Sequence, residues 1–351
     1  MPFTFNSATE ERGCTGFISG KRMTGNCTSI ESDYENKFLP AIYILVFIIG
    51  LGASGWVLKS MLQKQKKVGN NVFLLNLGLA NFLFLPTLPF LSAYYLMNSD
   101  WIFGDAFCKI TRFCFNLNLY GSIGFLTCIS VDRYLAIVHP MRVMGRMTVT
   151  HSVVISVMVW LLVSLQSLPD MFYPKTSTNK TNSNVNRTCY HTTSSEYIED
   201  YLKYSVGWTL TGFVIPFCIL LGCYGHVTVV LCHTNTIKKV VKQRSLNLLF
   251  ILILLFSVCY IPYHILRNLN LYSRGLRKQS ICPKWNNGVF SAHQISRGLV
   301  CLNSVLNPLV YLHIVDIPAQ LNQFLRRSRR MFDRLTISSY GRTPVTQSAQ
   351  D

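Results

Sequence analysis

Seven long runs of apolar residues, separated by short polar connections, dominate the pattern of the chain. They cover residues 38–62, 72–97, 107–138, 150–172, 202–232, 246–271 and 289–312. A helix needs about 20 predominantly apolar residues to cross the hydrocarbon core of a bilayer, and each run is long enough. The pattern therefore predicts an all-α membrane protein built as a seven-transmembrane helix bundle, with no internal repeat.

A shorter amphipathic segment follows the last run. Apolar side chains there share one face of a helix, at Ile317, Leu321, Phe324 and Leu325, and arginines occupy much of the rest. Such a helix lies along a membrane surface, in contact with lipid. We expect four parts: an extracellular N-terminal segment at 1–37, the seven-transmembrane domain at 38–314, an amphipathic membrane-surface helix at 315–332 and a cytoplasmic tail at 333–351.

The composition and the positions of the charges indicate how the chain is oriented in the membrane. Half of the 351 residues are hydrophobic, only 14% are charged, and the net charge is +18. The basic residues gather in alternate connections, at 64–67, 142–146 and 238–244, and after the last run, at 326–330. Cytoplasmic loops carry such an excess of Lys and Arg, so the pattern places the C-terminus in the cytoplasm and the N-terminus outside. We expect a multi-pass plasma-membrane protein that does not bind nucleic acid.

Glycosylation sequons and cysteines fit the same orientation. The sequons fall on the predicted outer side, at Asn26, Asn179 and Asn186. Four cysteines also lie outside, at Cys27, Cys108, Cys189 and Cys282. In an oxidising compartment they could form two disulfides, Cys108–Cys189 and Cys27–Cys282, although spacing alone does not fix the pairing, and Cys14 is left over. No His/Cys spacing typical of a metal site stands out, and no cofactor is expected.

Short motifs recur in a fixed order near the ends of the runs. They are Asp132, Arg133 and Tyr134 in the third, Tyr224 in the fifth, Pro262 in the sixth, and Asn307, Pro308 and Tyr311 in the seventh. Each is weak alone, but together they resemble the rhodopsin-like G-protein-coupled receptors over nearly the whole chain. The resemblance implies that a heterotrimeric G protein binds the cytoplasmic side. It also implies that receptor kinases and arrestin act on the serines and threonines of the tail.

The physical properties of these motifs suit a two-state switch. Arg133 can pair with Asp132 when the bundle is closed and turn toward a partner when the helices part, although a static interfacial ion pair is the alternative. Pro262 and Pro308 remove helical hydrogen bonds and predict bends about which half-helices could move.

Three arginines inside the apolar runs bear on the ligand, namely Arg112, Arg267 and Arg297. A guanidinium stays charged, and burying it within a membrane is costly. A single arginine often reaches for the interface or forms a structural ion pair. Three of them, from the outer halves of the third, sixth and seventh helices, would instead meet at one outward-facing cavity with few acids nearby. Guanidinium forks bind carboxylate and phosphate oxygens, so the arrangement favours a small anionic ligand.

Longer segments narrow the resemblance. FLPAIYILVFIIG, DWIFGDAFCK, NLYGSIGFLTCIS, GCYG and SRGLVCLNS are similar to the metabotropic purinoceptors, most closely the subtype that responds to adenosine diphosphate. Members of that branch share a second extracellular disulfide, which would match Cys27–Cys282. The resemblance implies that the three arginines hold nucleotide phosphates. It also implies a site shaped by other side chains, namely Tyr120, His264, Asn270 and Gln294. We expect Gq-type coupling, with phospholipase C and calcium release.

Three positions depart from that branch. Asn116 stands where nucleotide-binding members commonly carry histidine, His191 where the closest subtype has an aspartate, and His293 where it has a tyrosine. Asn116 and His293 are still expected at the ligand. Receptors for dicarboxylates such as 2-oxoglutarate and succinate share much of the arginine set and are the second candidate class. An anion transporter is a more remote alternative, because transporters usually show repeated halves. No nucleophile–base pair or phosphate loop indicates an enzyme.

Two further positions depart from the wider family. Its members nearly always carry aspartate where this chain has Asn81, and asparagine where it has Ser54. In the family that aspartate is the main anionic ligand of a sodium ion at the bundle centre. Asn307 stands where the nucleotide branch usually has a second carboxylate, so it does not compensate for the missing charge. We expect this chain not to bind sodium there.

Overall fold

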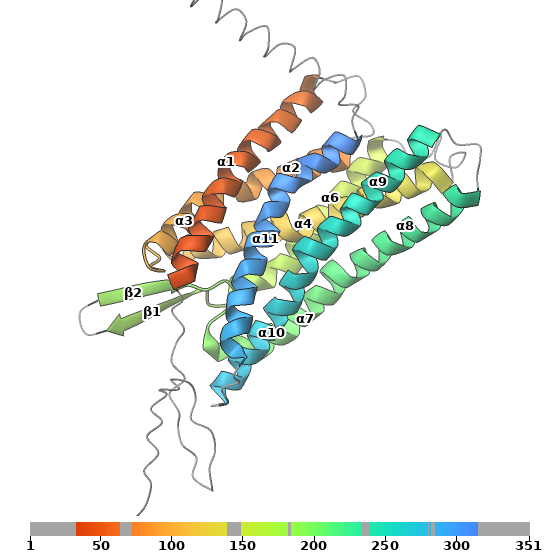
Figure 1. Cartoon of the computed structure of the whole chain (residues 1–351). Coiled ribbons are helices and arrows are strands. Elements are labelled where there is room, and N and C mark those ends of the chain that lie inside the picture. The colour runs from red at the N-terminus through yellow and green to blue at the C-terminus, as the bar shows by residue number, and fades with distance from the viewer. Residues whose placement is uncertain are drawn as a thin grey trace, which may run out of the picture. The chain divides into compact units, whose positions relative to one another are not determined.

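The computed structural model describes residues 33–63, 72–138, 149–181, 184–233, 239–279, 281 and 285–314. Its long helices lie side by side in a bundle (Figure 1). They are α1 (Asp33–Gln63), α2 (Val72–Phe84), α3 (Leu88–Leu96), α4 (Asp105–Val138), α6 (Val149–Phe172), α7 (Ile198–Thr209), α8 (Ile215–His233), α9 (Lys239–Leu255), α10 (Ile261–Lys278) and α11 (Asn286–Ile314). The chain divides into two units after Pro308, and the side chains discussed below belong to the first.

The seven predicted runs correspond to seven helical stretches. Within the described residues, six stretches are long and apolar enough to cross a membrane. They are Phe38–Ser60, Val72–Leu96, Asp105–Val138, Val149–Phe172, Ser195–Val230 and Leu246–Lys278. Helix α11 supplies the seventh. The predicted amphipathic helix at 315–332 and the tail lie outside the described residues.

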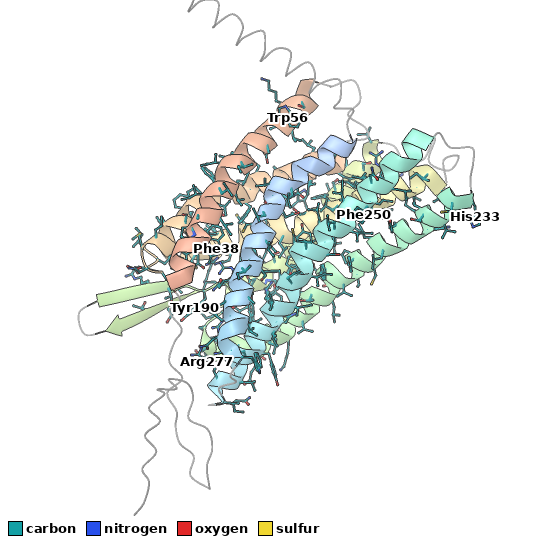
Figure 2. The ribbon with its side chains drawn as sticks, in the orientation of Figure 1. Phe38, Trp56, Tyr190, His233, Phe250 and Arg277 are labelled. Atoms are coloured by element: carbon teal, nitrogen blue, oxygen red, sulfur yellow. A yellow bond between two sulfur atoms is a disulfide. The ribbon has the colours of Figure 1, made fainter. Side chains whose placement is uncertain are left out.

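Helix α4 lies at the centre of the bundle, because it contacts α2, α6, α8 and α9. Along its length it buries polar as well as apolar side chains, among them Asn116, Asn118 and Ser122. The outward faces of the helices expose large apolar side chains. On α6, Leu165 is 70% exposed and Phe172 is 79% exposed. Figure 2 shows such side chains directed outward along the helices. Apolar outside and partly polar inside is the distribution expected of a bundle whose solvent is lipid.

Proline changes the helical repeat at three places. A 3₁₀ turn, Leu85–Thr87, contains Pro86 and joins α2 to α3. Two π-helical turns, η4 (Leu210–Val214) and η5 (Phe256–Tyr260), end just before Pro216 and Pro262. Proline lacks an N–H and its ring clashes with the carbonyl four residues earlier, so the preceding turn takes a different repeat. Helix α11, in contrast, continues through position 308 to Ile314.

A two-stranded hairpin lies between α6 and α7, where the sequence indicated only a long loop. Strands β1 (Thr176–Thr181) and β2 (Asn184–Cys189) are antiparallel, and Thr176 is opposite Cys189. Figure 1 shows the hairpin at the end of the bundle where α4 begins. The register sets the two sequon asparagines, Asn179 and Asn186, opposite each other. Glycosylation at these positions stays a prediction, and Asn26 lies outside the described residues.

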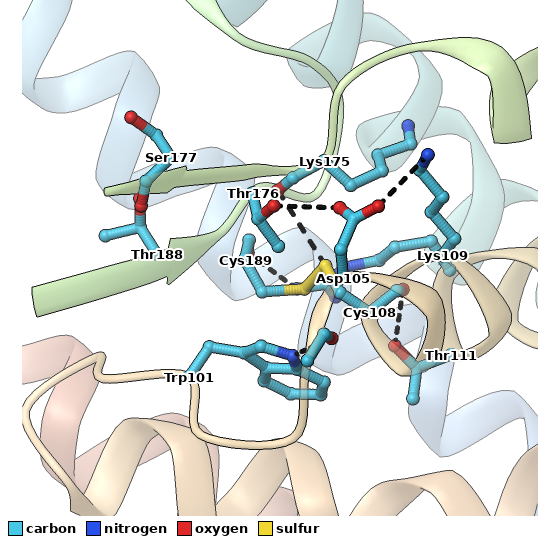
Figure 3. Close-up of a disulfide and its surroundings, with 12 residues drawn as sticks. Trp101, Asp105, Cys108, Lys109, Thr111, Lys175, Thr176, Ser177, Thr188 and Cys189 are labelled. Carbon is cyan, nitrogen blue, oxygen red and sulfur yellow. Dashed lines mark hydrogen bonds and ion pairs between the residues drawn. A yellow bond between two sulfur atoms is a disulfide. The ribbon is translucent and has the colours of Figure 1, made fainter.

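A disulfide ties the hairpin to the bundle. Cys108 in the first turn of α4 is bonded to Cys189 at the end of β2, with 5.9 Å between their Cα atoms (Figure 3). Beside it, the Thr176 hydroxyl donates a hydrogen bond to the Asp105 carboxylate at 2.8 Å, and Lys109 pairs with the same carboxylate at 3.1 Å. This disulfide is one of the two pairings expected from the sequence. Cys14, Cys27 and Cys282 lie outside the described residues.

Candidate functional site

Arg297, on α11, is 3% exposed and is held by uncharged groups. Its Nη1 donates to the Tyr95 hydroxyl at 2.9 Å and to Gln294 Oε1 at 2.5 Å, and its Nη2 donates to the Tyr43 hydroxyl at 3.2 Å. The guanidinium also lies over the Tyr95 ring, 5.9 Å from its centroid. The predicted ligand residue Gln294 therefore orients Arg297, from the preceding turn of the same helix.

Arg267, on α10, has the same kind of surroundings. It is 3% exposed, and its guanidinium donates to three phenolic hydroxyls. The distances are 3.3 Å to Tyr120, 3.5 Å to Tyr263 and 3.0 Å to Tyr201. The hydroxyl of Tyr120, predicted to shape the site, therefore accepts a hydrogen bond from Arg267. A neutral phenol satisfies donors of the guanidinium without cancelling its charge.

Arg112, on α4, reaches the end of the hairpin. Its Nη2 donates to the Cys189 carbonyl oxygen at 3.0 Å and lies 3.6 Å from the sulfur of that residue. It is 2% exposed. Like Arg267 and Arg297, it has a buried Nε atom with no hydrogen-bond partner among the described residues. Across the described part of the chain, none of the three arginines forms an ion pair with a carboxylate.

One buried carboxylate does lie near the arginines, and it was not predicted from the sequence. Asp170, at the end of α6, is 2% exposed. Its Oδ1 accepts from Lys175 Nζ at 2.6 Å and from the Tyr201 hydroxyl at 2.7 Å, and its Oδ2 accepts from Asn116 Nδ2 at 3.0 Å. Tyr201 thereby links Asp170 to Arg267. An acid inside an apolar run was the available signal, the same signal that singled out the arginines.

Lys175 is the main cationic partner of Asp170. It is fully buried in the segment between α6 and β1, and it also donates to the Thr192 carbonyl oxygen. Burial lowers the pKa of the Lys175 ammonium to about 8, while Asp170 acts in the opposite direction. The pair is thus a buried salt bridge between the end of α6 and the segment before β1, and the bond from Lys175 to Thr192 connects it to the loop after the hairpin.

We expect Asp170→Asn to lower the melting temperature and the surface expression of the protein strongly. Removing one member of a buried ion pair destabilises a protein by about 3–5 kcal/mol, because the other charge stays buried without a partner. Thermal unfolding of the purified protein and surface staining of transfected cells would measure the loss. The double variant Asp170→Asn, Lys175→Met should recover part of it. A single variant as stable as the wild type would contradict the assignment.

The other predicted ligand residues are two asparagines and two histidines. The amide of Asn116 donates a hydrogen bond to Asp170, and Asn270 is buried on α10 at 5% exposure. His264 and His293 are buried at 1% and 2%, and neither has a hydrogen-bond partner on either ring nitrogen among the described residues. His264 stacks on Phe213 with 4.5 Å between ring centroids. Of the tyrosine partners of the arginines only Tyr120 was predicted, because a tyrosine inside an apolar span reads as ordinary packing.

The predicted switch residues lie at the opposite end of α4. Arg133 Nε is 3.9 Å from Asp132 Oδ2, and both side chains are partly exposed. The Tyr134 hydroxyl is 3.1 Å from His226 Nδ1 on α8. Tyr224 packs with Tyr134 against a buried pair, Val227 and Leu249. The Asp132–Arg133 contact predicted for a closed bundle is therefore present, whereas the side chains of Pro308 and Tyr311 lie outside the described residues.

A cluster of amides occupies the middle of the bundle, at the position of the expected sodium site. The Asn81 side-chain oxygen accepts from Asn118 Nδ2 at 2.9 Å and from Asn307 Nδ2 at 3.1 Å. Asn307 Nδ2 also lies 3.4 Å from the Ser122 hydroxyl. Both lone pairs of the Asn81 carbonyl thus have donors already. Ser54, the other altered position, has a buried hydroxyl without a partner among the described residues.

A seven-helix membrane bundle with cationic side chains buried near its disulfide-bonded end defines a class, the seven-helix receptors. The chain matches the "7 transmembrane receptor (rhodopsin family)" over residues 56–311, and it belongs to that family. It is therefore a multi-pass membrane receptor and not an enzyme. This result confirms the resemblance carried by the motifs at the ends of the apolar runs.

Several relatives are similar over most of the chain. The P2Y purinoceptor 1 of Mus musculus is 40% identical over 307 residues, which cover 87% of this chain and 81% of the relative. The P2Y purinoceptor 1 of Bos taurus is 41% identical over 307 residues, with the same coverage. The 2-oxoglutarate receptor 1 of Mus musculus is 35% identical over 297 residues, 84% of this chain and 86% of the relative.

We expect sodium to leave the melting temperature and the agonist affinity of the wild-type protein unchanged, apart from general screening. A sodium ion would have to displace two amide donors from Asn81 and would gain no charged ligand there. The comparison is between sodium and a large organic cation at equal ionic strength. Asn81→Asp should gain a sodium effect, whereas Asn81→Ala should not. A clear sodium effect on the wild type would refute this prediction.

Proposed function

We propose that this chain is a cell-surface receptor for an extracellular nucleotide of the ADP or ATP type, and that it activates a heterotrimeric G protein. The observation that carries the proposal is the set of three buried guanidiniums, Arg112, Arg267 and Arg297, whose described partners are all neutral. Buried charges are normally paired. An anionic ligand would supply the missing negative charge.

The charge and the surroundings favour a nucleotide over a smaller anion. A nucleoside diphosphate carries about three negative charges near neutral pH, while a dicarboxylate carries about two. Three arginines match the former better. Aromatic rings also surround the arginines, among them Tyr95, Tyr120, Tyr201 and Tyr263. Bases stack on such rings, whereas a dicarboxylate has no group that needs them. The similarity to the P2Y purinoceptors supports the same choice.

The proposed orientation places the arginines and the hairpin outside the cell. The hairpin carries two sequons and a disulfide, and both features suit an oxidising, extracellular compartment. The N-terminal segment at 1–37 would then be extracellular, and the helix at 315–332 and the tail at 333–351 would be cytoplasmic. The basic residues of the alternate connections would face the cytoplasm.

Activation would be a shift between two populations of the bundle. The ligand anion draws the outer ends of α4, α10 and α11 together, because each contributes one arginine to it. The inner ends of α8 and α9 then part, and Arg133 leaves Asp132 for the G protein. We propose Gq-type coupling, with phospholipase C and calcium release. Receptor kinases and arrestin would act on the tail, and lipid would contact the apolar outer faces.

A dicarboxylate receptor is the second candidate function. The 2-oxoglutarate receptor 1 of Mus musculus is 35% identical to this chain, so the comparison keeps that ligand class open. Guanidiniums bind carboxylates as well as phosphates, so the same arginines could hold a dicarboxylate.

A ligand panel in transfected cells tests the proposal. ADP, ATP, UDP, 2-oxoglutarate and succinate would be compared with calcium and cyclic-nucleotide readouts, against untransfected cells. A response to adenine nucleotides at the lowest concentrations supports the proposal. A response to dicarboxylates alone would refute it and support the dicarboxylate receptor instead. Radiolabelled ligand should stay at the cell surface. Accumulation inside the cells would instead indicate a transporter.

A further inference from the structure

Two histidines from different parts of the chain meet beside the arginines. His191 follows the hairpin, and His293 lies on α11. Their ring centroids are 5.9 Å apart and the rings are nearly perpendicular, at 88°. Both rings also pack against Tyr263 of α10, with centroids at 6.3 Å and 6.1 Å, and His191 packs edge-on against Phe115 of α4 at 5.0 Å. We call His191 and His293 the histidine pair.

The histidine pair has unused hydrogen-bonding capacity. All four ring nitrogens are buried and lack a hydrogen-bond partner among the described residues, although His191 as a whole is only partly buried. A neutral imidazole has one N–H donor and one acceptor nitrogen. Leaving one buried polar group unpaired costs about 1–3 kcal/mol. Four such atoms in two adjacent rings point to a ligand that supplies their partners.

Among the described residues, the charged groups that most affect the histidine pair are all positive. The positive charges that most oppose protonation of His191 are those of Arg297 on α11 and Arg112 on α4. His293 and Arg267 of α10 act in the same direction. His293 is acted on by Arg297 and Arg267 and by Arg274, also of α10. Tyr263 is a further titratable group among the described residues, and its ring packs against both histidines. Burial and the three arginines hold the pKa of His191 well below its usual value, so that ring is neutral at physiological pH.

We propose that the histidine pair belongs to the ligand site and that binding of the anionic ligand is coupled to proton uptake by this pair. The inference rests on the proposed function, because it needs a polyanion among the three arginines. Phosphate oxygens accept hydrogen bonds from ring N–H groups. Their negative charge also offsets the field of the arginines, so the imidazolium form becomes favourable only in the complex.

The sign of the pH dependence follows from linkage. Ligand binding raises the proton affinity of the pair, so a lower pH must raise the ligand affinity by the same coupling. The affinity should increase by up to about tenfold per pH unit for each proton taken up, between the pKa of the complex and that of the free receptor. A merely structural histidine pair would contribute nothing to the pH dependence of the affinity.

The test uses the purified full chain in lipid nanodiscs. Binding of a thiophosphate analogue of ADP would be measured from pH 6 to pH 8 for the wild type, His191→Asn, His293→Asn and the double variant. The phosphate of the probe can titrate in the same range, so the slope of the double variant is the baseline. His233→Asn, at an exposed position near the end of α8, is the matched control. Calorimetry in two buffers of different ionisation enthalpy would count the protons directly.

We expect the affinity of the wild type and of His233→Asn to rise more steeply with falling pH than the affinity of the double variant. Equal binding enthalpies in the two buffers for the wild type, after subtraction of the probe's own ionisation, would overturn the proposal even if the double variant did not fold. If the ADP analogue did not bind, the nucleotide assignment would be wrong. The same measurement with 2-oxoglutarate would then decide the histidine proposal separately.

Discussion

Arg297→Ala should raise the agonist concentration needed for a half-maximal response by about ten- to a hundredfold, and Arg267→Ala should do the same. A hydrogen bond to a charged group contributes about 1.5–3 kcal/mol, and each 1.4 kcal/mol corresponds to a factor of about ten. The residues left behind are mainly neutral tyrosines, so neither variant leaves an unpaired buried charge. Surface expression should therefore largely survive.

Concentration–response curves, corrected for the number of receptors at the surface, would measure the effect. Arg297→Lys should fall between the wild type and Arg297→Ala, because it keeps the charge and loses the planar fork. Arg277→Ala is the matched control, since Arg277 lies in the last turn of α10, away from the bundle centre (Figure 2). Alanine variants that reach the surface and keep the wild-type response would show that these arginines do not hold the ligand.

Cys108→Ser or Cys189→Ser should abolish most delivery to the cell surface. The disulfide closes a loop between residues 81 positions apart and anchors the hairpin to α4. Loss of a native disulfide typically costs about 2–5 kcal/mol. The end of β2 would also no longer present the Cys189 carbonyl to Arg112. Surface staining against total expression would measure the loss.

Cys218→Ser is the control for this prediction, because Cys218 is a free and exposed cysteine on α8. Normal surface delivery of both disulfide variants would contradict the structural role given to the bond. Cys27→Ser and Cys282→Ser should chiefly reduce agonist potency, because we propose that their bridge holds the N-terminal segment over the ligand site. Mass mapping that paired Cys14 with Cys282 would overturn that second assignment.

The helices were predictable because a bilayer restricts the structures that can span it. A span must be helical and about 20 residues long, and seven apolar runs satisfied that requirement without knowledge of any tertiary contact. The π-helical turns η4 and η5 were not predictable in detail. Pro216 and Pro262 signal a disturbance, but the choice between a bend, a 3₁₀ turn and a π turn depends on packing against neighbouring helices.

The charges of the ligand site were predictable from the sequence, whereas most of their partners were not. Arg112, Arg267 and Arg297 stand out because a permanent charge is conspicuous in an apolar run. The tyrosines that hold them do not stand out, because a phenol is equally common in ordinary packing. The hairpin was missed for a different reason: its strands, TSTNKT and NVNRTC, show no alternation of apolar and polar residues. Its order comes from the disulfide and from contacts with the α3–α4 loop, such as Trp101 N to the Arg187 carbonyl oxygen.

The phenolic partners of Arg267 and Arg297 bear on the speed of binding. A carboxylate partner would have to be displaced by the arriving ligand and would weaken the field outside the site. Phenols do neither, so the attraction on an approaching anion is undiminished and accelerates the encounter, more strongly at low ionic strength. An uncharged nucleoside feels no such attraction. Discrimination between a nucleotide and its nucleoside therefore begins in the association rate constant, before any contact is made.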